Sequence, residues 1–217
     1  IGISGIFYTT AVLAIVGIAL LYLLVPDPVS SHFHRDAEVE PRSLFSVLGN
    51  TQLLRLNLGI FTLHFILMCV FQVLPLVLQN DMGINVHRHW EIYLPVFVVS
   101  LMIMVPFIII AERKHAMKGI FVGAVISLIV AIGIFVVTTH SLWLTIVALI
   151  IFFAGFNLLE ATLPSLVAKI TSATQKGTAM GVYSSSQFLG AFAGGAIGGG
   201  AHQLWGIAGV YYTALAF

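Results

Sequence analysis

Two titratable side chains, Glu160 and His64, lie deep inside long apolar stretches of this sequence. If these stretches cross a membrane, a charge at such a position costs about 3 kcal/mol or more, so it is rarely kept without a function. An acid or a base there is suited to taking up and releasing a proton, because its charge changes when it titrates. We therefore expect Glu160 and His64 to be candidates for proton coupling. The alternative for Glu160 is a structural carboxylate bonded to the backbone or to a neighbouring helix.

Other polar side chains interrupt the same stretches at helical spacing. Within residues 54–79, which also contain Pro75, four polar residues fall inside an arc of about 80° on one side of a helix: Asn57, His64, Gln72 and Gln79. Such a stripe can line a water-filled path, or it can hydrogen-bond neighbouring helices and only hold them together. We expect five polar residues to lie along a substrate pathway: Asn57, Gln72, Asn157, Tyr183 and Gln187.

The elements that position these residues are membrane-spanning helices. The 217 residues are 59% hydrophobic and 8% charged, with a mean hydropathy of +1.07, whereas a soluble domain carries about 25% charged residues. Apolar stretches of about 20 residues can cross a bilayer as helices. We expect six spans and the start of a seventh, so the sequence predicts an all-α polytopic membrane bundle: 2–25, 54–79, 92–111, 119–139, 142–167, 179–200 and 208–217.

The basic residues predict the orientation of this bundle. Of nine Lys and Arg residues, only Arg88 lies in the second, fourth or sixth connection between spans. The other eight lie in or beside alternate connections, which the positive-inside rule places in the cytoplasm: Arg35, Arg42, Arg55, Arg113, Lys114, Lys118, Lys169 and Lys176. The three tryptophans, Trp90, Trp143 and Trp205, lie at the opposite ends of the spans, as an interfacial belt would.

The longest connection, residues 26–53, is predicted to be a cytoplasmic linker. Residues 41–55 begin with a proline and contain spaced apolar residues, which favours a short amphipathic helix on the inner surface. His32 and His34 are better explained as part of a solvated linker than as metal ligands, because zinc needs further ligands. We expect no metal and no cofactor.

Small residues form two adjacent rows on the predicted span 179–200. At helical spacing, Gly190, Gly194 and Gly198 make one row, and Gly195 and Gly199 belong to the row beside it. In lipid, rows of this kind allow two helices to approach to backbone contact. We therefore expect these five glycines to be helix-packing residues.

The connection at residues 111–118, AERKHAMK, places Glu112 and Arg113 at a helix end. The pair can pin two helix ends together as a cytoplasmic gate, or it can consist of ordinary positive-inside charges. This turn resembles a second-half copy of the G-x-L-A-D-R-x-G-R-K loop of the major facilitator superfamily, with Glu112 and Arg113 at its acid and arginine positions. His115 and Ala116 depart from the later glycine and arginine positions of that loop.

The stretches FNLLEATLPSLVAK (156–169) and KGTAMGVYSSSQFLG (176–190), with VPFIIIAERKHAMK (105–118), resemble the proton-driven efflux branch of the same family. The resemblance implies two six-helix halves: residues 1–25 would be the last helix of the first half, 26–53 the central cytoplasmic linker, and 54–217 the second half with its final helix cut short. It implies a secondary antiporter in a bacterial cytoplasmic (inner) membrane. Such a protein would export small molecules by alternating access with the missing N-terminal half-bundle. The apolar helices with few charges favour lipophilic or weakly polar substrates.

Other classes of protein fit the sequence less well. A membrane enzyme would need catalytic groups that face each other, but the sequence holds no G-x-S-x-G or H-E-x-x-H motif and no pair of intramembrane aspartates. No basic cluster suits nucleic acid. The expected partners are therefore the lipid bilayer, a small-molecule substrate and protons. A non-transporting structural bundle and an uptake symporter of the same fold are the alternatives.

Overall fold

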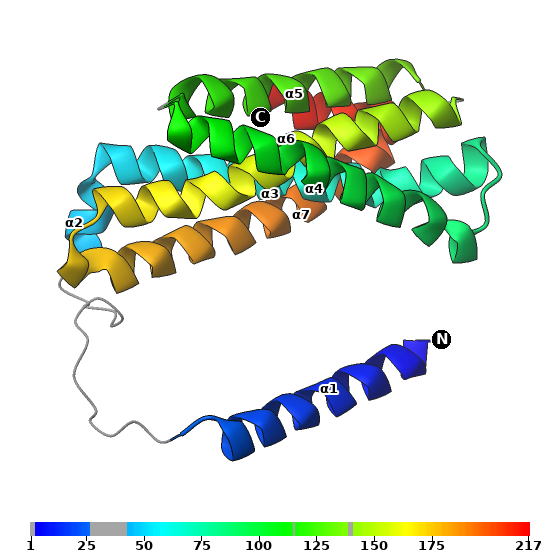
Figure 1. The fold of residues 1–217 in the computed structure, drawn as a ribbon. Coiled ribbons are helices and arrows are strands. Elements are labelled where there is room, and N and C mark those ends of the chain that lie inside the picture. Colours follow the sequence, from blue (N-terminus) through cyan, green and yellow to red (C-terminus); the bar gives the residue numbers. More distant parts are fainter. Residues whose placement is uncertain (1–2, 27–42, 115, 139–140) are drawn as a thin grey trace. The chain divides into compact units, whose positions relative to one another are not determined.

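The computed structural model describes residues 3–26, 43–114, 116–138 and 141–217, and within these ranges the regular elements are all helical. The chain divides into two units, Ile1–His34 and Arg35–Phe217. The first unit contains α1, Ile3–Leu24 (Figure 1). Large apolar side chains are exposed along the whole of α1, from Phe7 to Leu24. A helix that is apolar all round suits lipid or a partner helix.

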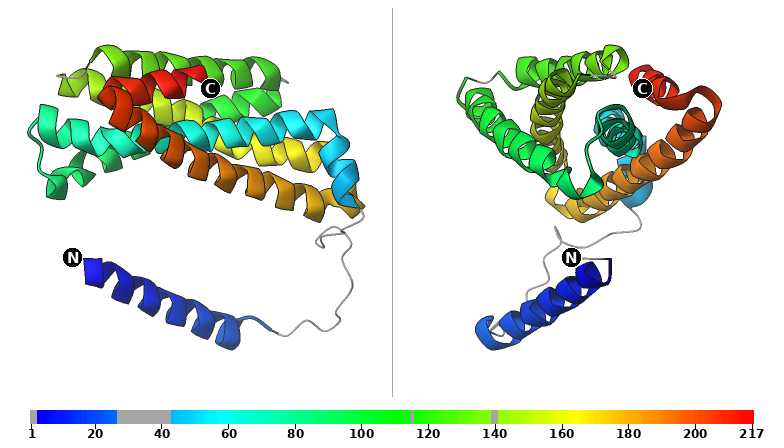
Figure 2. Two further views of the ribbon diagram at one scale, coloured as in Figure 1. Left: turned by 180° about the vertical axis from the view of Figure 1, so that it is seen from behind. Right: turned by 90° about the vertical axis from the view of Figure 1, so that its right-hand side faces the viewer.

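The second unit is a bundle of long helices (Figures 1 and 2). The short α2, Leu44–Gly49, leads into α3, Thr51–Leu76, and a π-helical turn, Val77–Asp81, extends α3 beyond Pro75. The remaining long helices are α4 (Trp90–Arg113), α5 (Met117–Val137), α6 (Leu142–Ile170) and α7 (Lys176–Ala216). Short 3-10 turns, Val86–Arg88 and Ala173–Gln175, precede α4 and α7.

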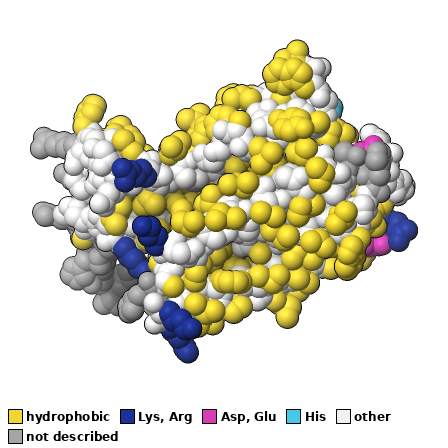
Figure 3. Space-filling model, turned by 90° about the horizontal axis from the view of Figure 1, so that it is seen from above, with side chains coloured by type: hydrophobic (Ala, Val, Ile, Leu, Met, Phe, Trp, Pro, Cys, Tyr) yellow, Lys and Arg dark blue, Asp and Glu magenta, His cyan; other side chains and the backbone are white. Residues whose placement is uncertain are grey.

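Helix α3 forms the centre of the core, where it packs against α6 and, over the longest contact, α7. The surface of the bundle is also apolar, as the wide yellow area in Figure 3 shows. Exposed side chains such as Met102 (70%) on α4 and Ile129 (55%) on α5 are part of it. Lipid-facing side chains gain nothing from burial in protein, so this distribution is the one expected in a membrane.

Five helices of the described chain are long and apolar enough to cross a membrane: Ser4–Leu24, Thr51–Asp81, Val86–Arg113, Met117–Val137 and Leu142–Ile170. The sixth expected span, 179–200, lies within α7, which does not reach the same hydropathy. Its many glycines and the polar run from Tyr183 to Gln187 lower the mean hydropathy. The expected helix is present, but composition alone identifies only the other five spans.

Helix α7 has a sharp turn at Gly206, whose backbone has φ 67° and ψ −161°. The positive φ favours glycine, because other residues meet steric strain there. Beyond the turn the chain reverses direction (Figure 2). Tyr211 stacks on Phe135 of α5 with ring centroids 5.5 Å apart, and Phe217 stacks on Phe65 of α3 at 3.9 Å. The expected seventh helix at 208–217 is thus a separate helical segment on the same core.

The predicted helix within residues 41–55 corresponds to α2 and the first residues of α3. Asn50 separates the two helices, and its side-chain oxygen accepts hydrogen bonds from the backbone of Gln52 and Leu53 at 3.0 and 3.3 Å. Val47 is buried and Phe45 is 82% exposed, as in an amphipathic helix.

Five basic or histidine residues considered in the sequence lie outside the described residues: Arg35, Arg42, His32, His34 and His115.

Candidate functional site

Three helices bring His64, Glu160 and Gln187 into contact. The amide nitrogen of Gln187 on α7 lies 2.9 Å from Nε2 of His64 on α3 and 3.1 Å from Oε1 of Glu160 on α6. The other carboxylate oxygen, Oε2, lies 3.9 Å from the same His64 nitrogen. The two proton-coupling candidates therefore lie side by side, and a pathway candidate bonds to both.

The partners of the two ring nitrogens indicate which nitrogen of His64 donates and which accepts a hydrogen bond. An amide nitrogen is only a donor, so Nε2 of His64 accepts from Gln187. The other ring nitrogen, Nδ1, lies 3.3 Å from the backbone oxygen of Ile60, to which it can only donate. These contacts fit the imidazole tautomer that carries its proton on Nδ1. The carboxylate of Glu160 accepts a hydrogen bond from Gln187.

Several buried polar atoms of α3, α6 and α7 have no hydrogen-bond partner among the described residues. They are Oε2 of Glu160, the hydroxyl of Tyr183 and both amide atoms of Asn57. Tyr183 precedes Gln187 by one helical turn, and Asn57 precedes His64 by two turns. Both residues are buried, with 4% and 5% of their surface exposed. These donors and acceptors can bind a polar group of a substrate or water.

The other two pathway candidates make different contacts. Asn157 donates from its amide nitrogen to the hydroxyl of Ser100 on α4 at 3.2 Å, and Ser100 donates to the backbone oxygen of Phe97. Gln72 is exposed and donates to the backbone oxygen of Gly195 at 3.5 Å. Both side chains therefore join helices, and for Gln72 this is the alternative that the sequence left open for the polar stripe.

Three of the five packing glycines face α3 at close range. A Cβ atom at Gly190 or Gly194 would collide with the backbone oxygen of Phe61 or Phe65, respectively. At Gly198 it would lie 2.7 Å from Oε1 of Gln72. The backbones of α3 and α7 thus touch at Gly190 and Gly194, and at Gly198 the side chains of Gln72 and Cys69 fill the space.

The second glycine row differs from the first. At Gly199 an added Cβ would lie 3.0 Å from Nε2 of Gln72, whereas at Gly195 it would meet no atom within 4 Å. Gly195 instead meets α3 through its backbone oxygen, which accepts a hydrogen bond from Gln72 at 3.5 Å. The sequence predicts a groove formed by both rows, and the row of Gly190, Gly194 and Gly198 makes the closer contact with α3.

The cytoplasmic gate candidates, Glu112 and Arg113, are both exposed at the end of α4. Neither forms an ion pair with another described residue. An ion pair that the sequence reasoning missed lies at the other end of α4, where Arg88 contacts Glu91 at 2.9 Å. Its sequence signal was the i, i+3 spacing of opposite charges.

Most of the Lys and Arg side chains visible in Figure 3 gather at one end of the bundle. The described basic residues lie at the start of α3, around the α4–α5 turn and around the α6–α7 turn. They are Arg55, Arg113, Lys114, Lys118, Lys169 and Lys176. Trp90, Trp143 and Trp205 are exposed near the opposite helix ends. This distribution agrees with the pattern from which the sequence predicts a cytoplasmic side.

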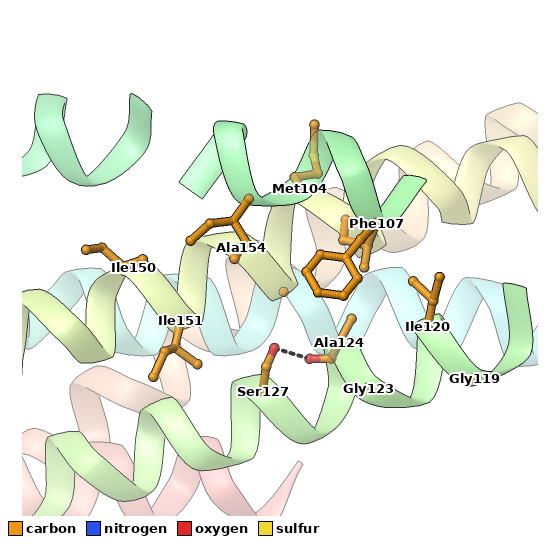
Figure 4. Close-up of a pocket in the computed structure, with 13 residues that line it drawn as sticks. Met104, Phe107, Gly119, Ile120, Gly123, Ala124, Ser127, Ile150, Ile151 and Ala154 are labelled. Atoms are coloured by element: carbon orange, nitrogen blue, oxygen red, sulfur yellow. Dashed lines mark hydrogen bonds between the residues drawn. The ribbon is translucent and has the colours of Figure 1, made fainter. Parts of the chain in front are cut away.

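Two cavities of the bundle lie apart from the polar cluster. One, of about 390 Å³, lies between α4, α5 and α6 and is almost wholly apolar. Figure 4 shows its Ser127 hydroxyl turned to the backbone oxygen of Ala124, at 2.7 Å. The other, of about 410 Å³, lies between α3, α5, α6 and the C-terminal segment. Neither is lined by Glu160, His64 or Gln187, so the chemistry of the cluster does not take place in them.

The sequence is similar to a family of membrane transport proteins. The family model of the Major Facilitator Superfamily matches residues 1–195. The inner membrane transport protein YajR of Escherichia coli K12 is 40% identical over 211 residues, which are 97% of this chain and 46% of that protein. An uncharacterized transporter, BU466, of Buchnera aphidicola subsp. Acyrthosiphon pisum is 29% identical over 194 residues, 89% of this chain and 50% of its own length.

A third relative is an uncharacterized transporter of Buchnera aphidicola subsp. Baizongia pistaciae, which is 37% identical over 161 residues. These residues are 74% of this chain and 41% of that protein. The chain thus spans about half the length of the curated relatives it matches. The names of all three relatives are those of transport proteins, as expected for a protein that is not an enzyme.

Proposed function

This chain belongs to the Major Facilitator Superfamily, and from that premise we propose that it forms part of a secondary active transporter. In this proposal, a small molecule passes between this half-bundle and an N-terminal half-bundle by alternating access. Residues 1–25 are the last helix of the first half, 26–53 the central linker, and 54–217 the second half. The described helices are those of a multi-pass membrane protein, which supports this assignment.

Proton coupling through Glu160 is the central part of the proposal. The observation that carries it is the contact of Glu160 with Gln187 and His64 across three helices. A carboxylate in this position is held by a neutral amide and faces a neutral imidazole. No Lys or Arg among the described residues pairs with it, so protonation removes an uncompensated charge from the bundle. Loss of that charge makes the reorientation of the two halves cheaper.

The transport direction and the substrate class are further proposals. The stretches 156–169 and 176–190 resemble the proton-driven efflux branch of the family, which supports export by antiport. The polar atoms around Glu160 are few and the surrounding core is apolar, which favours lipophilic or weakly polar molecules. One relative is named an inner membrane protein of a bacterium, and this supports the bacterial cytoplasmic membrane as the location.

We also propose that the basic helix ends lie in the cytoplasm, with Glu112 and Arg113 in a gate on that side. The orientation can be tested in the complete protein after Cys69 has been replaced. A cysteine at Ser141 should react with an impermeant thiol reagent added to intact cells, whereas one at Ala173 should react only after the membrane is opened. The reverse labelling pattern would overturn the orientation.

The test of proton coupling uses the substitution Glu160→Gln in the full-length protein. Glutamine has the shape and the neutral charge of a protonated glutamate, so the variant should insert and fold but lose proton-driven transport. The assay is accumulation of ethidium, a lipophilic cation, in everted membrane vesicles with and without an imposed pH gradient. Glu91→Gln is the matched control, because that carboxylate is exposed at the opposite end of the bundle.

Each alternative gives a different result in this assay. A structural bundle would move no ethidium in the wild type. An uptake symporter would move ethidium in the same direction as the protons, whereas an antiporter moves it in the opposite direction. Retention of full gradient-driven transport by Glu160→Gln would place the coupling acid elsewhere in the protein.

A further inference from the structure

The amide nitrogen of Gln187 lies between the base and the acid of the polar cluster. It is 2.9 Å from Nε2 of His64 and 3.1 Å from Oε1 of Glu160, while these two side chains approach each other only to 3.9 Å. An amide group carries two N–H donors, so Gln187 can donate to both neighbours at once. It therefore takes the place of a direct hydrogen bond between His64 and Glu160.

This arrangement treats the two titratable groups differently. A proton on Nε2 of His64 would point at the N–H of Gln187, so the imidazolium form requires the amide to rotate or move away. Protonation of Glu160 requires no such change. Its Oε2 atom makes no hydrogen bond with a described residue, and Oε1 continues to accept from Gln187 after Oε2 has gained a proton.

We propose that Gln187 is a positioning residue that directs the coupling proton to Oε2 of Glu160 and prevents an ion pair between Glu160 and His64. The inference rests on the proposed proton coupling. In the loading step, a proton from water on one side of the membrane forms an O–H bond with Oε2. The charge of the three side chains changes from −1 to 0. The same proton leaves to water on the other side after the two halves reorient, which completes the balance.

The other charged and titratable groups around the cluster do not replace this role. Besides His64, Tyr183 on α7 is a titratable side chain close enough to interact with Glu160. Its hydroxyl has no hydrogen-bond partner among the described residues. Cys69 on α3 donates to the backbone oxygen of Gly194, beyond the cluster. Arg55 on α3 lines the separate cavity shared with α5. Among the described residues, His64 is thus the base close enough to form an ion pair with Glu160 if it gained a proton on Nε2.

Removal of the amide should change the site in a definite direction. Without Gln187, His64 can take a proton on Nε2 and close the 3.9 Å gap to Glu160. The imidazolium then favours the ionised carboxylate, so protonation of Glu160 needs a more acidic medium. A side chain that only fills space would not produce this effect, and the effect depends on the presence of His64.

The experiment follows the carbonyl stretch of protonated carboxylic acids by infrared difference spectroscopy. The full-length protein is reconstituted in phospholipid and titrated with acid, and Glu160→Gln identifies the band of Glu160. We expect the midpoint of this band in Gln187→Met to lie about one pH unit below that of the wild type. Methionine keeps the volume and the unbranched shape without a hydrogen bond, and Gln187→Ala serves if the Met variant does not fold.

The control variants separate this role from simple loss of packing. His64→Ala alone should move the midpoint by less than about half a pH unit, because the neutral ring contributes little charge. The double variant Gln187→Met/His64→Ala should lose the acid shift. An unshifted midpoint in Gln187→Met, or an acid shift that persists without His64, would overturn the inference while leaving Glu160 as the coupling acid. If no band disappears in Glu160→Gln, both the inference and the proposed coupling fail.

Discussion

Two neighbouring regions of the contact between α3 and α7 differ in how completely their atoms are paired. Along the row of Gly190, Gly194 and Gly198, an added Cβ atom would meet the backbone of α3 at the first two positions and the side chains of Gln72 and Cys69 at the third. Beside this row, the cluster of His64, Glu160 and Gln187 contains a carboxylate oxygen without a hydrogen bond. The packed row can hold α3 and α7 at a fixed distance, so that one amide reaches both neighbours. The polar cluster can titrate because it is not fully paired.

The largest expected effect comes from breaking the packed row. A leucine at Gly194 would collide with the backbone oxygen of Phe65 and push α7 away from α3. Overpacking of this kind costs about 1–3 kcal/mol, and more where backbone must move. We expect Gly194→Leu to abolish transport and to lower strongly the yield of monodisperse full-length protein, measured by size-exclusion chromatography in detergent.

Two controls distinguish this contact from a general intolerance of α7. Phe188→Leu changes an exposed side chain on the same helix and should leave the yield within about twofold, because exposed substitutions cost little. Gly194→Ala and Gly195→Ala form a closer pair, since only the first methyl group meets the α3 backbone. Equal yields of these two alanine variants would show that the row of Gly190, Gly194 and Gly198 does not pack closely against α3.

The sequence was sufficient to predict the helices and the single residues of this comparison, but not their pairing. Periodicity and hydropathy placed α3, α4, α5 and α6 to within about three residues. Glu160, His64 and Gln187 were each predicted to be functional because each is a polar group inside an apolar span. Their common contact depends on the depth and rotation of three helices relative to one another. Tertiary packing determines these, and they cannot be read from the sequence of a single span.

Asn157 shows the same limit within one helix. It lies three residues before Glu160 on α6, a spacing at which two side chains can lie on the same side of a helix. At 100° per residue the two side chains still differ by about 60°, and Asn157 reaches Ser100 on α4 instead. The turn at Gly206 was missed for another reason, since a glycine among many gives no sign of which one has a positive φ.

A smaller effect is expected from the base of the cluster. His64→Ala removes a neutral acceptor from Gln187 but leaves the carboxylate, so proton-driven transport should fall several-fold without disappearing. The measurement is ethidium accumulation in everted vesicles at a fixed pH gradient. His87→Ala is the matched control, because His87 is an exposed histidine in the turn before α4. Complete loss of transport in His64→Ala would make His64 a direct proton carrier, contrary to its proposed role as the acceptor of a hydrogen bond from Gln187.

The smallest effect sharpens the comparison, because α3 and α7 each contribute one glutamine to it. Gln72 donates to the backbone oxygen of Gly195 at 3.5 Å and is exposed, whereas Gln187 bonds to two titratable groups. A hydrogen bond between membrane helices contributes about 0.6 kcal/mol on average. Gln72→Met should therefore lower the thermal stability of the full-length protein only slightly, and its transport should stay within about twofold of the wild type. It should also leave the infrared midpoint of Glu160 unchanged, because Gln72 makes no contact with the acid. A midpoint shift in Gln72→Met as large as that in Gln187→Met would mean that any disturbance of the α3–α7 contact reaches Glu160, and the distinction between the packed row and the polar cluster would fail.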